Sequence, residues 1–457
     1  MTSLLKSAWS RLTGGATSSA APARPVVAAS RPRAADPAQD RVQDISPGKL
    51  GARRPLISAN HGVEGFEFRI GTELRARFRR QPEPTAQAAY VAAILTSARL
   101  TAQSGRRGLA RLPLDWLTHK TQAVVSRGVM VAVDRPTGEP QPGDDQHALL
   151  QNLGAMRAAG AEIGWPIDTQ INLKRDFVLL RQGESEIGVI LEQIKNWPIE
   201  AQGLPIVLTD VPHLEDVELA LIDGIRYVCG AVAPREAVSA KDAQILSPEA
   251  QRIAQILQQL VTGAETAAIV EQIKADVGLS YNLLRRLKSA ELAQLRDCNS
   301  IEQAVQLLGR NELYRWLTML LLKSPGNRKG VHALQEIALW RARLFELMAQ
   351  QRHEPAPGQL FTLGLASMLG AMLKITPLEV VATLSLSGDG AQAILQQTGP
   401  WAAYLDIASA IESHALDDWA DLTDAFGGVQ QVIELSDQAW AWAASSVRFD
   451  PGQEESD

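Results

Sequence analysis

The sequence predicts an α/β domain that forms a compact barrel, followed by an all-helical domain. Residues 51–236 alternate short β-like runs with helical patterns, which is typical of a largely parallel sheet. Roughly eight β-like runs fall in this region, which is the number that closes a small α/β barrel. From about residue 247 onward the apolar residues recur at helical spacing instead. A chain of 457 residues is long enough for both domains.

The barrel prediction depends on stretches rich in apolar and β-branched residues, with helical patterns between most of them. The predicted strands are residues 54–58, 65–70, 108–114, 129–134, 162–167, 177–181, 205–210 and 227–232. The predicted helices are residues 84–103, 146–159, 186–196 and 214–223. We therefore expect these strands to run mostly parallel to one another.

The helical prediction is strongest over residues 265–322, where three apolar stripes are separated by short joints. The three stripes are Ile269, Ile273 and Val277; Leu279, Leu283, Leu284 and Leu287; and Ile301, Ala304, Val305 and Leu308. The helix that follows, from about Glu312, is apolar almost all round, so we expect it in the middle of a bundle. Four tryptophans fall within helical patterns and are predicted to lie in the core: Trp316, Trp340, Trp440 and Trp442.

Capping residues support the predicted helix boundaries. Ser300 is a predicted N-cap with Gln303 at capping-box spacing, and Gly309 is predicted to end that helix. Residues 237–250 form the predicted junction between the domains. Within it, Ser247 is a predicted N-cap followed by Pro248 at the first helical position.

Composition excludes several classes of protein. Apolar residues make up 46% and charged residues 21%, and the net charge is −6, so neither nucleic acid nor an anionic membrane is expected as the main partner. The two cysteines, Cys229 and Cys298, argue against a disulfide scaffold and fit a reducing, cytoplasmic compartment. No apolar run reaches the roughly 20 residues that a membrane span requires.

The ends of the chain are predicted to be tails. Residues 1–50 hold few large apolar residues after the first turns, so ordering them would cost more entropy than burial returns. A short amphipathic helix over residues 4–12 is the alternative for the start. Residues 446–457 are read as an acidic tail. The predicted domains are therefore residues 51–236 and 245–445.

The helical half resembles a known family. The run D-V-G-L-S-x-x-L-L-R-x-L-x-S-A, followed by S-I-x-Q-A-V-x-L-L-G and L-x-R-W-L, resembles the HDOD domain. The resemblance implies an all-helical relative of the metal-dependent HD phosphohydrolases that lacks their metal-binding residues. None of the seven histidines is followed by Asp. Where the active relatives carry a His-Asp pair, this chain has Leu363-Gly364-Leu365-Ala366, which predicts a packing surface.

The first half is similar to a second family. R-P-L-I-S-A-N-x-x-V-E-G-F-E-F-R-I resembles the start of EAL domains, and D-V-x-L-A-L-I-D-G-I-R-Y-V-C-G-A-V-A-P-R-E resembles their end. EAL domains are barrels that hydrolyse cyclic di-GMP. A degenerate, TIM-like EAL-type barrel followed by an HDOD bundle is a pairing found in bacterial signalling proteins. The resemblance covers residues 51–445.

The EAL resemblance also implies a set of ligand positions, which this chain departs from. The family chemistry needs carboxylates, an Asn and a Gln to hold two divalent cations, and a Lys near the attacking oxygen. Glu67 falls on the first Glu of the family. The remaining positions fall on Arg111, Ala132, Pro166, Ile167, Leu179, Thr209 and Cys229. A slip of one residue could recover Asp134 or Asp168, but no full metal cage. We therefore expect no catalytic, metal or cofactor site, and interpret Glu67 as a solvated or salt-bridged carboxylate at a strand end.

Three further candidate sites lie outside the predicted barrel region. His414 with Asp417 and Asp418 has helical spacing that could bind a metal, although a solvated helix end is the favoured interpretation. Cys298 lies beside Asp297, which makes it a poor nucleophile. The stretch around Gly278 and Ser280 has the pattern of a DNA-reading helix-turn-helix, whose second helix would carry Arg285, Arg286 and Lys288.

The favoured function is a non-enzymatic signalling protein or scaffold that binds other signalling proteins through the helical domain. Homodimer formation stays open. Three alternatives stay open as well: binding of cyclic di-GMP without hydrolysis, a residual cyclic di-GMP phosphodiesterase using displaced ligands, and a helix-turn-helix DNA-binding regulator.

Overall fold

The structure is a computed structural model that describes residues 54–58, 62–118, 125–136, 146–199, 201–287, 300–323, 331–386, 388–413 and 422–448. Several predictions lie outside these residues: the tail over residues 1–50, the amphipathic helix over residues 4–12, the reactivity of Cys298, and the candidate metal site of His414, Asp417 and Asp418.

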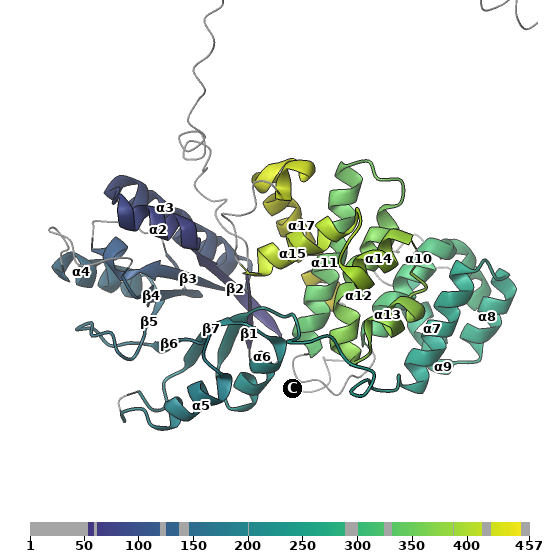
Figure 1. Cartoon of the computed structure of the whole chain (residues 1–457), viewed down its shortest axis with the longest axis horizontal. Coiled ribbons are helices and arrows are strands. Elements are labelled where there is room, and N and C mark those ends of the chain that lie inside the picture. The colour runs from purple at the N-terminus through teal and green to yellow at the C-terminus, as the bar shows by residue number, and fades with distance from the viewer. Residues whose placement is uncertain are drawn as a thin grey trace, which may run out of the picture. The chain divides into compact units, whose positions relative to one another are not determined.

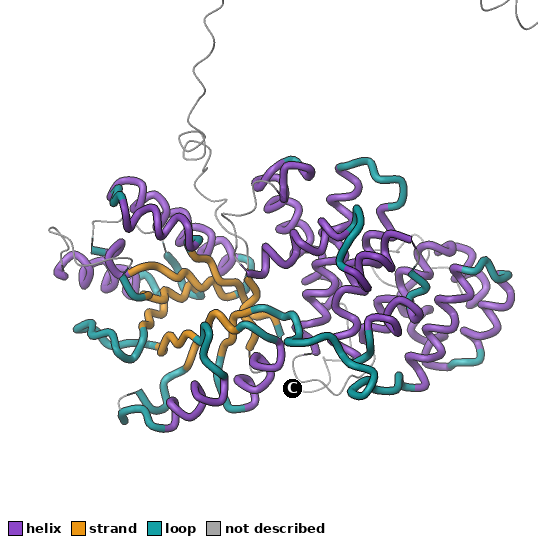
Figure 2. The backbone as a smooth tube through the Cα atoms, viewed as in Figure 1, coloured by secondary structure: helices purple, strands orange, loops and turns teal. Residues whose placement is uncertain are grey.

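A closed barrel forms the first domain, with its strands in chain order from β1 to β8 (Figure 1, Figure 2). The strands are β1 (Arg54–Ser58), β2 (Val63–Arg69), β3 (Arg107–Pro113), β4 (Val129–Asp134), β5 (Glu162–Trp165), β6 (Phe177–Arg181), β7 (Ile206–Val211) and β8 (Tyr227–Gly230). β1 runs antiparallel to both of its neighbours, and every other neighbouring pair is parallel. The predicted fold class is therefore confirmed.

Helices connect the parallel strands, as the alternating pattern predicts. They are α2 (Thr72–Arg80), α3 (Pro84–Gln103), α4 (Gln146–Ala158), α5 (Ile187–Lys195) and α6 (Leu214–Ile222), with a short 3₁₀ turn at Leu114–Leu117. Helix α2 was not predicted from the sequence. Its sequence is TELRARFRR, which contains the buried Phe78 but no apolar residues recurring at helical spacing to form a stripe. A helix that buries one side chain carries too weak a periodic signal to be recognised.

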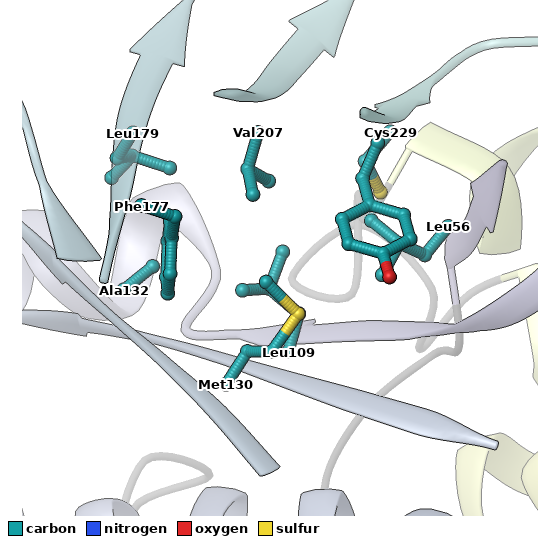
Figure 3. Close-up of a cluster of buried hydrophobic side chains, with 9 residues drawn as sticks. Leu56, Leu109, Met130, Ala132, Phe177, Leu179, Val207 and Cys229 are labelled. Atoms are coloured by element: carbon teal, nitrogen blue, oxygen red, sulfur yellow. The ribbon is translucent and has the colours of Figure 1, made fainter. Parts of the chain in front are cut away.

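The interior of the barrel is filled by an apolar layer (Figure 3). The layer consists of Leu56, Leu109, Met130, Ala132, Phe177, Leu179, Val207, Tyr227 and Cys229. Members on the same strand are two residues apart, because alternate side chains of a strand point to the same face. Gly164 makes room for this layer, since a Cβ atom there would lie 2.3 Å from the ring of Phe177. The barrel is thus a packed core at this level.

The second domain is entirely helical where it is described. Its helices are α7 (Pro248–Val261), α8 (Thr266–Lys274), α9 (Val277–Leu287), α10 (Ile301–Lys323), α11 (Val331–Gln351), α12 (Pro357–Leu373), α13 (Pro377–Thr383), α14 (Gly388–Gln396), α15 (Ala402–Ser413) and α17 (Gly428–Arg448). The last helix runs slightly past the predicted domain end at residue 445.

The predicted caps are confirmed. The hydroxyl of Ser247 accepts a hydrogen bond from the backbone N–H of Ala250 at 3.2 Å, with Pro248 following as the first helical residue. Ser300 accepts in the same way from the N–H of Gln303 at 3.2 Å. Gly309 interrupts α10 with a φ of 72°, a conformation that favours glycine, and a second helical segment follows at once.

The apolar stripes are mostly buried. The buried members are Ile269, Ile273, Leu279, Leu283, Ile301, Ala304 and Val305. Leu284 and Leu308 are half-buried, and Val277 is 83% exposed. The prediction for Val277 was wrong because α8 ends at Lys274, so Val277 starts α9 rather than continuing the stripe of α8.

Most of the predicted core aromatic residues lie in the interior. Trp316, Trp340 and Trp440 are buried, whereas Trp442 is half-buried. In the second segment of α10, Leu313, Leu317 and Leu321 are buried, while Met319 and Leu320 are only half-buried. This segment is therefore less completely enclosed than its composition predicts.

Helices α11 and α12 make the closest approach in the helical domain. A Cβ atom on Gly364 of α12 would lie 2.4 Å from the Cα and the N of Ala342 on α11. Leu363, Leu365 and Ala366 beside it are buried. The four positions that the resemblance aligns with the His-Asp pair of active HD proteins are thus buried, and Gly364 among them packs against α11.

Candidate functional site

A cluster of charged side chains lies directly above the apolar layer, at the carboxyl ends of the parallel strands. The strand alternation places it there: Arg111, Asp134 and Arg181 each lie two residues beyond a member of the layer on the same strand. Arg54 lies two residues before Leu56 on β1, which runs in the opposite direction. The carboxyl ends of the strands are where barrel enzymes build their active sites.

We call this group the arginine–carboxylate cluster. It consists of Arg54, Glu67, Arg69, Arg75, Arg111, Asp134, Arg181 and Asp210, which are joined by ion pairs. Five guanidinium groups face three carboxylates, so the cluster carries two more positive than negative charges.

Glu67 is the innermost carboxylate and is fully buried. It accepts hydrogen bonds from Nε and Nη2 of Arg54 at 2.8 and 2.5 Å, and the thiol of Cys229 donates to it at 3.3 Å. Burial alone would raise the pKa of Glu67, but the guanidinium groups of Arg54 and Arg111 overcome this effect and hold its pKa at about 2. Of the two interpretations made from the sequence, the salt-bridged one is confirmed. The solvated strand end is wrong, because Glu67 lies inside β2 and has no contact with solvent.

Asp210 is the point where the arginines converge. Its Oδ1 accepts from Nη2 of Arg54 at 2.8 Å and from Nη1 of Arg69 at 2.7 Å. Its Oδ2 accepts from Nη1 of Arg111 at 2.9 Å and from Nε of Arg181 at 2.7 Å. Burial would raise the pKa of Asp210, but these arginines, with Arg111 foremost, hold it well below its usual range.

A backbone irregularity directs Asp210 into this position. The register between β7 and β8 shifts between Leu208 and Val211, and Asp210 has a φ of 55°. Strict alternation would point the side chain of Asp210 to the face of β7 opposite that of Thr209. A bulge of this kind redirects the side chain. Asp tolerates the left-handed region better than most other non-glycine residues.

Arg111 links the outer two carboxylates and is 2% exposed. Its Nε donates to Asp134 at 2.9 Å and its Nη1 to Asp210 at 2.9 Å. Burial would lower the pKa of Arg111, but the carboxylates of Asp134 and Asp210 raise it instead. The third nitrogen, Nη2, is buried and has no hydrogen-bond partner among the described residues.

The cluster predicts that barrel stability depends on pH. Glu67 has a pKa of about 2 in the folded state against an ordinary value of 4.5, so its ionised form stabilises the fold above about pH 4.5. This contribution, about 3 kcal/mol, should be lost as the pH falls toward 2, and Asp134 and Asp210 shift in the same direction. We expect the urea midpoint of barrel unfolding to fall steadily from about pH 5 to about pH 2. A midpoint that stays constant over this range would contradict the ionised cluster.

The remaining ligand positions of the EAL resemblance do not form a metal site. Ala132, Leu179 and Cys229 belong to the apolar layer inside the barrel (Figure 3). The hydroxyl of Thr209 donates to the carbonyl of Leu180 at 3.3 Å. Pro166 and Ile167 follow β5 and are half-buried. Burial, together with nearby Glu67, raises the pKa of the Cys229 thiol well above its usual range.

Of the two acidic residues that a register slip could recover, only one reaches the cluster. Asp134 accepts from Arg111 and, at 3.2 Å, from Nη1 of Arg75. Asp168 instead pairs with Arg135 at 2.5 Å near the surface, where both side chains are more than half exposed. Within the described part of the chain, no group of three or more His, Cys, Asp and Glu side chains could hold a metal ion. The cluster does not fit divalent cations, because each carboxylate is already paired with arginine.

Sequence reasoning missed five members of the site: Arg54, Arg69, Arg75, Arg181 and Asp210. A signal was available for Arg54 and Arg181, since both lie two residues from an apolar inward position of a predicted strand. No local signal marks Asp210, because its direction depends on the bulge between β7 and β8.

The structure corrects the local geometry of the predicted helix-turn-helix. The second helix begins at Val277, so Gly278 lies in its first turn rather than in the joint. Asp276 opens the helix, since its Oδ1 accepts from the N–H of Leu279 at 3.1 Å. Ser280 does not open it; its hydroxyl donates to the carbonyl of Ile273 at 2.8 Å. Lys288 lies outside the described residues.

The fold defines a two-domain protein in which an α/β barrel precedes an all-helical domain. Residues 246–393 match the HDOD domain family, so the helical half contains an HDOD domain. Together with the closed barrel, this match is consistent with a protein that joins an EAL-like barrel to an HDOD domain. Among the helices of the described residues, none is long and apolar enough to span a membrane.

Two curated relatives are similar to part of the chain. An uncharacterized protein of Bacillus subtilis, YuxH, is 33% identical over 157 residues, which is 34% of this chain and 38% of that protein. The cyclic di-GMP phosphodiesterase CdgJ of Vibrio cholerae is 29% identical over 206 residues, which is 43% of this chain and 46% of that protein. The matched segments thus span less than half the length of each relative.

Solved structures also resemble the chain. The EAL-domain protein YkuI of Bacillus subtilis, solved in complex with cyclic di-GMP and calcium, is 14% identical and has a TM-score of 0.31. That comparison covers 60% of this chain and 76% of YkuI.

Proposed function

We propose that this chain is a cyclic di-GMP signalling protein that acts by binding rather than by turnover, and whose helical domain contacts other signalling proteins. The observation that carries the proposal is the position of Arg111. Its guanidinium group joins Asp134 and Asp210 and lies 3.5 Å from Glu67, so a permanent cation already pairs with the carboxylates that a metal would need. The similarity to CdgJ supports the signalling class.

Electrostatics supports the absence of metal-dependent hydrolysis. A divalent cation near the carboxylates would be repelled by the surrounding guanidinium groups in a buried environment, where charges are weakly screened. Arginine cannot give up its proton to make room, and the pKa values of Arg54 and Arg111 are raised further by their partners. The cluster is therefore unfavourable for the two metal ions that would activate a water for attack on a phosphodiester.

The proposal predicts that purified full-length protein does not hydrolyse cyclic di-GMP in the presence of magnesium or manganese. The measurement is chromatographic analysis of the nucleotide after long incubation, with CdgJ as the positive control. Metal-dependent appearance of the linear dinucleotide would contradict the proposal and support a residual phosphodiesterase. Because contaminating enzymes also hydrolyse cyclic di-GMP, such activity must fall in the variant Asp134→Asn, which removes a carboxylate that a metal would need, if it belongs to this barrel.

A further inference from the structure

We propose that the acidic segment after α17, residues 449–457, binds back onto a surface of the helical domain that contains Arg315, Arg343 and Trp442. The inference rests on the proposed function, because it names the surface and the chemistry with which the helical domain contacts a partner. A partner segment that carries carboxylates would have to displace the chain's own acidic segment. The surface is therefore an interaction site that the chain itself covers.

Two arginines from different helices share one carboxylate on this surface. Nη1 of Arg315 on α10 donates to Oε1 of Glu346 at 2.7 Å, and Nη1 of Arg343 on α11 donates to Oε2 at 2.6 Å. Among the described residues, neither arginine forms an ion pair with a second carboxylate. Within this group, two guanidinium groups face one carboxylate, so one positive charge is in excess. An acidic occupant complements that charge.

Both guanidinium groups lie over aromatic rings. The Cζ atom of Arg315 lies 3.9 Å from the ring centre of Phe361 and 5.4 Å from that of Trp442. The Cζ atom of Arg343 lies 5.9 Å from the ring centre of Trp442. A guanidinium group that stacks on a ring with its flat face keeps its N–H donors at the edge. Arg315 and Arg343 are 20% and 27% exposed, so their remaining donors can bind a carboxylate that approaches from solvent.

Half-buried apolar side chains extend this surface along two helices. Met319 follows Arg315 by four residues on α10, and Leu347 follows Arg343 by four residues on α11, so each pair shares one helix face. Met319, Leu347 and Trp442 are all half-buried. Aromatic residues, Met and Arg are the types that are enriched in protein interfaces. The surface therefore fits a peptide segment that presents an apolar side chain beside a carboxylate.

Residues 449–457 have this chemistry and the necessary reach. Their sequence is FDPGQEESD, which carries four carboxylate side chains and no basic residue, and Phe449 stands directly before Asp450. Trp442 lies six residues before the end of α17, which is about 9 Å along the helix. Nine extended residues span up to about 30 Å, so the carboxylates can reach back to the surface. The tether also gives the segment a high local concentration, which strengthens a contact that is weak between separate molecules.

The test is a titration with a fluorescein-labelled peptide of residues 449–457, followed by fluorescence polarisation. The peptide is added to the unmodified full-length protein and to a full-length neutralised variant, which carries Asp450→Asn, Glu454→Gln, Glu455→Gln and Asp457→Asn. Arg343→Gln, added to the neutralised variant, removes one guanidinium group and leaves Arg315 to pair with Glu346. The matched control is Arg352→Gln, which removes an arginine that also pairs with one carboxylate and lies over an aromatic ring.

We expect the peptide to bind the neutralised variant at least tenfold more tightly than the unmodified protein, because the native segment competes only in the latter. Arg343→Gln should weaken this binding about tenfold, since a charge-assisted hydrogen bond is lost. Arg352→Gln should leave the binding unchanged, and added salt should weaken it. Circular dichroism should show the same helix content in every variant.

Three results would overturn the inference: no binding of the peptide to the neutralised variant at millimolar concentration, equal affinity for the neutralised variant and the unmodified protein, or equal weakening by Arg343→Gln and Arg352→Gln. Sedimentation tests a second copy of the chain as the source of the segment. A dimer of the unmodified protein that dissociates in the neutralised variant would also overturn the contact within one chain.

These outcomes are separable from the proposed function. Hydrolysis of cyclic di-GMP would remove the non-catalytic barrel and leave the peptide titration unchanged. Failure of the peptide to bind would remove the surface as an acidic-segment site and leave the absence of hydrolysis standing.

Discussion

Replacing Glu67 with leucine is expected to lower the free energy of unfolding of the barrel by about 3–5 kcal/mol, because it leaves a buried arginine without its main partner. Glu67 takes both Nε and Nη2 of Arg54, and both side chains are almost completely enclosed. The guanidinium of Arg54 would keep only its contact with Asp210. Urea unfolding followed by circular dichroism measures the loss, and hydrogen exchange of β1 and β2 locates it in the barrel.

Two further variants separate charge pairing from packing. The double substitution Arg54→Met with Glu67→Leu should recover most of the stability, since an apolar pair of similar volume replaces a buried ion pair at little cost. Glu64→Leu on the same strand is the matched control, because Glu64 is only half-buried and should change stability by about 0.5 kcal/mol or less. A double variant as unstable as Glu67→Leu alone would show that packing around Glu67, rather than its pairing with Arg54, stabilises the barrel.

Replacing Gly364 with alanine is expected to destabilise the helical domain by about 3 kcal/mol, at the upper end of overpacking effects. The added methyl group would lie 2.4 Å from backbone atoms of Ala342, and backbone cannot move aside as a flexible side chain can. Helices α11 and α12 would have to separate, exposing cavities along their shared core. The expected measurement is a lower urea midpoint for the helical transition, with faster hydrogen exchange in α11.

Gly358 on the same helix provides the control. A Cβ atom there would meet nothing within 4 Å, so Gly358→Ala should be neutral or slightly stabilising, since alanine favours helix. Equal stability of Gly364→Ala and Gly358→Ala would mean that the two helices pack less tightly than the structure shows.

Local sequence patterns were enough to predict many of the strands and helices. Strand β4 and strand β6 were predicted with their observed bounds because each is a short, strongly apolar run closed by a charged residue, Asp134 or Arg181. Ser247 with Pro248, and Ser300, marked helix starts because capping depends on residues within one turn. Helix α2 was missed because its sequence is rich in arginine and Phe78 is its one buried apolar side chain, so no apolar stripe marks it.

The sequence by itself determined the order of elements and the two domains, because each of these depends on residue type and on spacing along the chain. Only the tertiary structure decided which charged side chains meet at the carboxyl end of the barrel. Arg54, Glu67, Arg111 and Asp210 come from four different strands, and they meet because the sheet closes into a barrel. Whether Glu67 is solvated or buried, and whether Asp210 points inward, depends on that closure and on the bulge in β7. Neither the closure nor the bulge is encoded in any local run of residues.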